Sequence, residues 1–194
     1  MFRLRQPAVI TITILLATIA VAQSRQARPD TAANDSILVY GDGFVFSVKE
    51  PNSWHCLCGP AASEYQVNAI FLPASAQSKA HHVTIRVRVN QKSDENTLED
   101  LKADMRQYKQ RYPKVQFLPL DVAHAEYKTY TELFAFPDDF YDYVGYVNPG
   151  PNSSFMLSVA MSKEKVPATQ EELAAYAEVL RSLHVFTGGP PHAH

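Results

Sequence analysis

The chain has 194 residues, of which 46% are hydrophobic and 20% are charged, and its formal net charge at pH 7 is −2. These proportions are typical of a globular protein, and a weakly acidic chain without a basic block argues against nucleic acid and anionic membrane surfaces as partners. Its two cysteines are too few for a disulfide framework, so we expect an ordinary hydrophobic core to hold the fold.

The first 22 residues have the pattern of a signal peptide. Arg3 and Arg5 precede an apolar or small run from Ala8 to Val21, and Ala20-Val21-Ala22 supplies the small residues that a signal peptidase requires before Gln23. This run is shorter than the roughly 20 residues that span a bilayer, and no second hydrophobic run follows it. We therefore predict a secreted or periplasmic protein that keeps no stable membrane anchor after cleavage.

The rest of the chain divides into a leader, one domain and a tail. Residues 23–35 are polar and unpatterned, which predicts a flexible leader, and residues 188–194 predict a disordered tail. Residues 36–187 are expected to form a single domain, whose size allows about 70% of the unfolded surface to be buried.

The domain begins with strand patterns. Residues 36–40 and 44–48 predict a β-hairpin with a glycine-containing turn. Residues 51–62 are interpreted as a turn-rich stretch. Residues 67–72 predict the next strand, and in residues 82–89 apolar side chains alternate with polar ones, which indicates a half-buried strand.

A helix is expected next, beginning at Asn96 or Thr97 and ending before Pro113. Asn96 and Glu99 have the spacing of a capping pair. The apolar residues of this segment are spaced by three or four and form one stripe: Leu98, Leu101, Met105, Tyr108 and Tyr112.

The second half combines further strand patterns with a closing helix. The strands are predicted over residues 115–120, 125–136, 140–147 and 155–161. The closing helix opens with Thr169-x-x-Glu172, which is a capping-box pattern. Because hairpins join most of the strands, we predict the α+β class, with helices packed on an antiparallel β-sheet.

The order of these elements forms a known pattern. An opening Phe44-Val-Phe-Ser-Val-x-x-Pro-x-x-Trp54, a helix in the middle of the chain, paired aromatic strands and a closing helix that ends Val179-Leu-Arg-Ser-Leu183 resemble the PsbP-like superfamily. The resemblance covers roughly Ser36 to Phe186 and is closest to uncharacterised bacterial exported proteins of that type. It implies an α–β–α sandwich and transfers no catalytic residue, because this superfamily has no common active site.

The most distinctive chemistry in the sequence lies at His55-Cys56-Leu57-Cys58. Two thiols beside an imidazole suit a soft ion such as Cu(I), and outside the reducing cytosol they must be oxidised, metal-bound or shielded. The alternatives are a disulfide in a loop, or two small, partly buried residues without chemistry. A copper-binding or redox protein that uses His55, Cys56 and Cys58 is therefore one prediction.

Two charged groups are further candidates. Arg86 and Arg88 project from one face of their strand, which suits an anion-binding surface, whereas the alternative is a solvated face or one covered by an acidic helix. Asp138, Asp139 and Asp142 cluster at a predicted turn, where ordinary turn solvation competes with weak Ca²⁺ binding.

Aromatic side chains are concentrated in residues 127–146. A strand turns about half of such residues inward as core. The remainder are expected to form a surface groove for a ligand or a partner protein, with Tyr130, Tyr141 and Tyr143 as its candidates.

The sequence lacks Gly-x-Ser-x-Gly, a phosphate-binding glycine loop and His-Glu-x-x-His. It therefore favours a non-enzymatic binding or accessory domain, without a cofactor, that acts on an envelope protein or a small ligand. The alternatives are the copper or redox protein and a hydrolase whose site residues are dispersed along the chain.

Overall fold

The structure is a computed structural model that describes residues 36–75, 83–92 and 97–186. The predicted signal peptide, leader and tail lie outside these residues, as does Asn96 of the predicted capping pair. Among the helices that the structure describes, none has both the length and the apolar character needed to cross a membrane.

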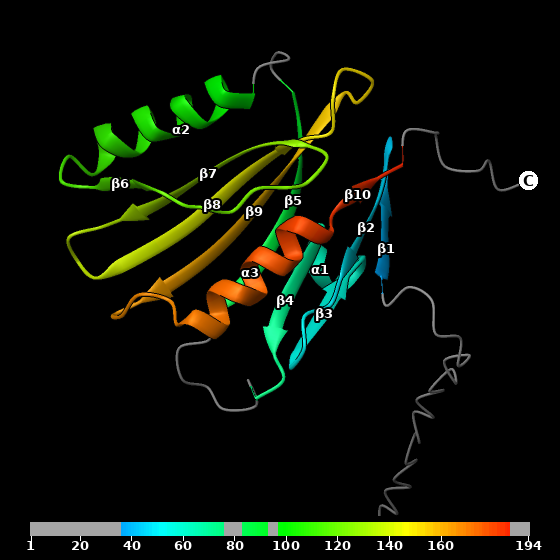
Figure 1. Ribbon diagram of the computed structural model, residues 1–194, viewed down its shortest axis with the longest axis horizontal. Coiled ribbons are helices and arrows are strands. Elements are labelled where there is room, and N and C mark those ends of the chain that lie inside the picture. Colours follow the sequence, from blue (N-terminus) through cyan, green and yellow to red (C-terminus); the bar gives the residue numbers. More distant parts are fainter. Residues whose placement is uncertain (1–35, 76–82, 93–96, 187–194) are drawn as a thin grey trace, which may run out of the picture. The chain divides into compact units, whose positions relative to one another are not determined.

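The described residues form ten strands and three helices (Figure 1). The helices are α1 (Pro60–Ser63), α2 (Thr97–Arg111) and α3 (Gln170–Ser182). The strands are β1 (Ser36–Gly41), β2 (Phe44–Lys49), β3 (Trp54–Cys58), β4 (Ala69–Pro73), β5 (Thr84–Gln91), β6 (Gln116–Pro119), β7 (Lys128–Ala135), β8 (Phe140–Asn148), β9 (Phe155–Glu164) and β10 (His184–Val185).

Seven strands form one antiparallel sheet in the order β3-β4-β5-β9-β8-β7-β6. The strands β6 to β9 follow one another as hairpins, and β9 then pairs with β5, from Thr84 opposite Ser162 to Gln91 opposite Phe155. The predicted hairpin at the start of the domain forms a second sheet, in the order β1-β2-β10. The prediction of an antiparallel α+β fold is therefore confirmed.

The two longer helices pack on opposite faces of the large sheet (Figure 1). Because successive side chains of a strand point to opposite faces, Val147 and Leu157 join the core beneath α3, while Val144 and Met156 join the core beneath α2. The layers are therefore helix, sheet and helix.

Close packing of α3 on β8 depends on a glycine. A Cβ atom on Gly145 would lie 2.6 Å from Cδ1 of Leu180 and 2.8 Å from the hydroxyl oxygen of Tyr176, and both of these side chains are fully buried in the core. Only a residue without a side chain lets α3 approach the sheet this closely.

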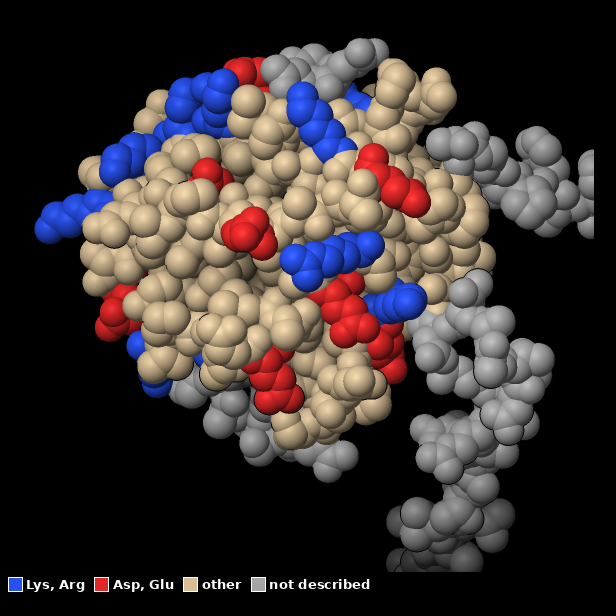
Figure 2. Space-filling view, viewed as in Figure 1, with Lys and Arg blue, Asp and Glu red and all other residues tan. Residues whose placement is uncertain are grey.

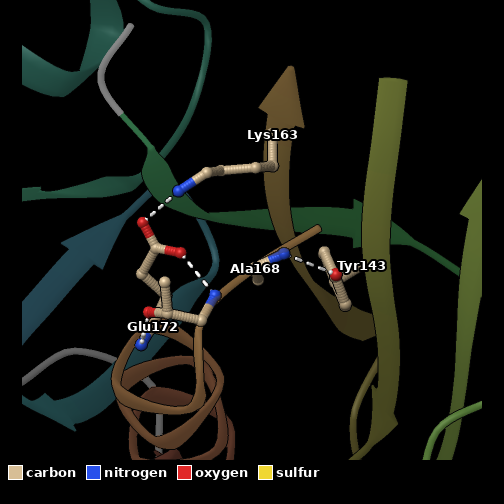
Figure 3. A network of polar contacts seen from close by, with 5 residues as sticks. Tyr143, Lys163, Ala168 and Glu172 are labelled. Atoms are coloured by element: carbon tan, nitrogen blue, oxygen red, sulfur yellow. Dashed lines mark hydrogen bonds and ion pairs between the residues drawn. The ribbon is translucent and has the colours of Figure 1, made fainter. Parts of the chain in front are cut away.

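The predicted capping box of α3 is present (Figure 3). The hydroxyl oxygen of Thr169 accepts a hydrogen bond from the backbone N–H of Glu172 at 3.2 Å, and the Glu172 carboxylate accepts one from the backbone N–H of Thr169 at 2.7 Å. Just before the helix, the Tyr143 hydroxyl accepts the backbone N–H of Ala168 at 2.9 Å. These bonds satisfy N–H groups that would otherwise lack partners at the start of a helix.

The stretch interpreted as turn-rich differs from the prediction. Residues 54–58 form β3, and Pro60–Ser63 form the short helix α1. The reason is tertiary, because β3 obtains its hydrogen bonds from β4, with Trp54 opposite Pro73 and Cys58 opposite Ala69. The two-residue strand β10 was likewise not predicted, because pairing with β2 alone defines it.

Candidate functional site

The α2 side of the large sheet carries a hollow of about 540 Å³. α2 packs mainly on β8 and β7, and the hollow lies beside it over β5 and β9. We call this hollow the polar groove. It is lined from β5 by Arg86, Arg88 and Asn90, from β9 by Met156, Ser158 and Ala160, from β8 by Asp142, Val144 and Tyr146, from β7 by Phe134, from α2 by Asp100, Ala103, Asp104, Gln107 and Tyr108, and by Val67.

One side of the groove is basic because of the alternation in β5. Ile85 and Val87 are buried in the core under α3, so Arg86 and Arg88 project to the opposite face, as predicted. The Nε–H of Arg88 donates a hydrogen bond to the carbonyl oxygen of Gln66 at 3.1 Å, which fixes the orientation of this exposed side chain.

Arg86, Ser162 and Asp142 form a polar network across three neighbouring strands. The Arg86 guanidinium donates to the Ser162 hydroxyl oxygen and lies 3.7 Å from Oδ1 of Asp142, and the Ser162 hydroxyl donates to the same carboxylate oxygen at 2.7 Å. Asp142 is the most buried member, with 11% of its side chain exposed against 37% for Arg86. Burial raises the pKa of Asp142, although the Ser162 hydrogen bond and the Arg86 charge oppose that effect.

One donor of this network has no acceptor. The Nε–H of Arg86 is buried and makes no hydrogen bond within the described residues. A buried donor without a partner costs free energy, because folding removes it from water without supplying an acceptor.

The other side of the groove is acidic because of α2. Its Asp104 carboxylate accepts a hydrogen bond from the Tyr146 hydroxyl of β8. Burial, together with the bond to Asp104, raises the pKa of Tyr146, and burial also raises the pKa of Tyr108. Both phenols therefore remain uncharged hydrogen-bonding groups.

A second hollow of about 620 Å³ adjoins the polar groove and shares Arg86, Tyr108 and Asp142 with it. This hollow extends past Asp138 and Asp139 of the turn before β8. The predicted Asp cluster is thus divided, since Asp142 is buried in the network with Arg86 and Ser162 while the two turn residues are exposed. Within the described ranges, no group of three or more His, Cys, Asp and Glu side chains is placed to hold a metal ion.

Charges on the molecular surface are mixed. On the face shown in Figure 2, acidic and basic side chains intermingle, and basic side chains also gather on the left, where Figure 1 places α2.

The residues of the predicted copper site lie on two faces of β3. Cys56 and Cys58 are free thiols that pack against the core under α3, whereas His55 points to the other face, with 69% of its side chain exposed and Nδ1 4.0 Å from Oε1 of Glu50.

Burial, followed by the charges of Cys58 and Glu50, raises the pKa of Cys56 to about 12. The thiol is therefore protonated at neutral pH, which disfavours nucleophilic attack. Copper binding here stays a prediction.

The three tyrosines predicted to line one groove are not brought together. Tyr130 pairs with Tyr146 and packs on the α2 side of the sheet. Tyr141 and Tyr143 lie on the α3 side, where Tyr143 is buried and bonded to Ala168. Tyr146, which was not among the predicted site residues, lines the polar groove instead.

Two polar residues of β9, Ser158 in the groove lining and Ser162 in the network with Arg86, were not among the predicted site residues. Their signal is present, because small or polar residues alternate there with Leu157, Val159 and Met161. The pairing of β9 with β5, which brings this polar face beside Arg86, is not visible in either segment alone.

No protein-family model matches the chain, and no curated protein sequence matches it. Among solved structures, the chain is similar to LpqN of Mycobacterium tuberculosis, described as involved in cell envelope biogenesis, with a TM-score of 0.55 and 11% sequence identity over 75% of this chain and 83% of LpqN. A structure from Bacteroides thetaiotaomicron is similar with a TM-score of 0.36 and 12% identity, over 77% of this chain and 46% of that protein. The likeness to LpqN shows a shared fold, and the PsbP-like resemblance stays a prediction.

Proposed function

We propose that the protein is an exported, non-enzymatic accessory domain of the cell envelope that binds its ligand in the polar groove. The observation that carries this proposal is the open sheet face beside α2, where charged and hydroxyl groups surround a hollow of about 540 Å³. Binding sites are typically concave and contain a few polar groups that fix the orientation of a ligand.

The chemistry of the groove favours binding over catalysis. Ser158 lines the groove, and its hydroxyl accepts a hydrogen bond from Asn90 at 2.9 Å. Among the described residues that line the groove there is no histidine. An activated serine requires an adjacent general base, so the Ser158 hydroxyl is suited to contact a ligand.

The envelope location rests on two supports. The signal-peptide pattern of residues 1–22 predicts export. The fold is shared with LpqN, whose description places that protein in cell envelope biogenesis.

Export is tested by producing the full chain in a bacterial host and sequencing the N-terminus of the protein recovered outside the cytosol. Cleavage before Gln23 is the expected result. An uncleaved chain that stays in the cytosol would contradict the export part of the proposal.

Ligand binding is tested by measuring the Tm of the secreted protein with fractions of small molecules from an envelope extract. We expect at least one fraction to raise the Tm of the wild type and to have a weaker effect on Arg88→Gln. Arg181→Gln, which removes an exposed arginine on α3, is the matched control and should respond like the wild type. If no fraction raises the Tm, or if Arg88→Gln responds fully, the groove is not the ligand site.

A further inference from the structure

We infer that the polar groove binds a zwitterionic ligand, an α-amino acid or short peptide, whose carboxylate lies against Arg86 and Arg88 and whose ammonium group lies against Asp104. This inference rests on the proposed function and specifies the class of ligand. It comes from the separation of opposite charges across the groove.

The two signs of charge come from different elements. The guanidinium groups belong to β5, whereas Asp104 belongs to α2, which packs mainly on β8 and β7. β9 lies between β5 and β8 and contributes Met156, Ser158 and Ala160 to the lining. Arg88 of β5 and Asp104 of α2 thus line the same hollow from different elements, so one ligand can meet both charges.

The basic side has donors for a carboxylate. Arg88 uses its Nε–H on Gln66, which leaves its terminal nitrogens for a ligand. The Arg86 guanidinium, with 37% of its side chain exposed, lines the same side of the groove. Guanidinium groups bind carboxylates well because their N–H donors match the geometry of the two oxygens.

The acidic side has acceptors for an ammonium group. Asp104 is bonded through Oδ2 to the Tyr146 hydroxyl, so this contact fixes the carboxylate while leaving Oδ1 as an acceptor. The Tyr108 hydroxyl lines the same side of the groove. An ammonium group carries three donors and is satisfied by such a set of oxygens.

Charge complementarity favours a zwitterion over an ion of one sign. An anion would lie near the carboxylates of Asp104 and Asp142, and a cation would lie near Arg86 and Arg88. A neutral ligand would leave both sets of charges without a counter-charge. A dipolar ligand oriented along the groove gains a counter-charge on each side, from Arg88 at one end and from Asp104 at the other.

The test is isothermal titration calorimetry of the full secreted protein with defined probes. The probes are the free amino acids and a set of tripeptides, each compared with its N-acetylated and its C-amidated form, together with inorganic phosphate and a neutral disaccharide. We expect at least one zwitterion to bind, and each capped form to bind on the order of tenfold or more weakly. High salt is expected to weaken binding, because the contacts are between charges.

Variants then identify the two sides of the groove. Arg88→Gln should weaken the binding of the zwitterion about as much as C-amidation of the ligand does. It should have little further effect on the binding of the C-amidated ligand. Asp104→Asn should weaken the binding of the zwitterion about as much as N-acetylation does, with little further effect on the N-acetylated ligand. Arg181→Gln should bind every probe like the wild type. The capped ligands carry the test even if one variant does not fold.

The inference is overturned if no zwitterion binds, or if capping either end leaves the affinity unchanged. Binding of the disaccharide or of phosphate instead, with a loss in Arg88→Gln, would contradict the ligand class but support the groove as a binding site. If no probe binds and no extract fraction changes the Tm, the proposed function fails as well.

Discussion

The Lys163 ammonium and the Glu172 carboxylate form an ion pair that joins the last residues of β9 to the first turn of α3 (Figure 3). Both side chains are mostly buried, with 15% and 17% exposed. The second carboxylate oxygen of Glu172 accepts the backbone N–H of Thr169. A single side chain therefore caps the helix and connects it to the sheet.

Glu172→Gln should lower the free energy of unfolding by about 1.5–3 kcal/mol, because the amide keeps an oxygen for the cap but leaves Lys163 mostly buried without a counter-charge. Urea denaturation measures the loss. Glu171→Gln removes an exposed charge from the same turn and should cost under about 0.5 kcal/mol. Equal losses in the two variants would show that the ion pair contributes nothing beyond the helix dipole.

The loss in Glu172→Gln should also depend on pH. Burial by itself would raise the pKa of Glu172, but the hydrogen bonds from Lys163 and Thr169 and the Lys163 charge lower it overall. The pKa of Glu172 is therefore lower in the folded protein than in the unfolded chain. The stabilisation by this carboxylate is complete at pH values above the unfolded pKa, and it is lost as the pH falls through the folded pKa. The difference between wild type and variant should therefore shrink from about pH 6 to about pH 3.

Asp142→Asn should change the pH dependence of stability in the opposite direction. Burial raises the pKa of Asp142, so this residue stabilises the fold most below its unfolded pKa, and that contribution is lost as the pH rises through the folded pKa. Asp142→Asn should lack this decrease in the free energy of unfolding with rising pH. Urea denaturation at a series of pH values measures it. Asp138→Asn, in the exposed turn, should keep it. An unchanged pH profile in Asp142→Asn would mean that burial does not control this carboxyl.

Leu101→Ala and Leu180→Ala should each lower the free energy of unfolding by about 2–5 kcal/mol, because each leaves a cavity in a core. Leu101 of α2 is 3% exposed and Leu180 of α3 is fully buried, so the pair tests both helix layers. Leu118→Ala, at a site that is 45% exposed, should cost under about 0.5 kcal/mol. A loss of that small size in Leu101→Ala would mean that α2 does not pack on the sheet.

The Cys56 thiol should react slowly with a thiol-specific reagent while the protein is folded. Its pKa is raised to about 12, so very little thiolate is present at about pH 8. In the variant Cys58→Ser, Cys56 is the only thiol. Its reaction with the reagent should become much faster when the variant is unfolded in denaturant. A rapid reaction of this variant in the native state would contradict the shielding of Cys56.

The sequence was sufficient to predict α2, α3 and most of the strands, because each carries its own periodicity or capping pattern. Arg86 and Arg88 were placed on a common face by alternation alone. Whether that face is covered depends on α2 lying over β8 and not over β5, which is a tertiary fact. The sequence therefore left two alternatives for Arg86 and Arg88, an anion-binding surface and a solvated or covered face.

The grouping of His55 with Cys56 and Cys58 shows a different limit. In a turn, the side chains of neighbouring residues such as His55 and Cys56 can meet at one site. Residues 54–58 form a strand, in which neighbouring side chains point to opposite faces. The tyrosines pose a similar problem, because the register of β7 against β8 decides which of them share a face. That register places Tyr130 opposite Tyr146 and so apart from Tyr141 and Tyr143.

The pairing of β5 with β9 has a consequence for how the protein folds. Arg86 and Ser162 are 76 residues apart in the chain, and the sheet between them closes only when β9 arrives beside β5. Contacts of such long sequence separation carry a large loop-closure entropy and slow the folding reaction. We therefore expect the floor of the polar groove to assemble late, after the hairpins β6 to β9 have formed. A chain that lacks β9 has no groove, and the edge of β5 that does not pair with β4 is left without a neighbour.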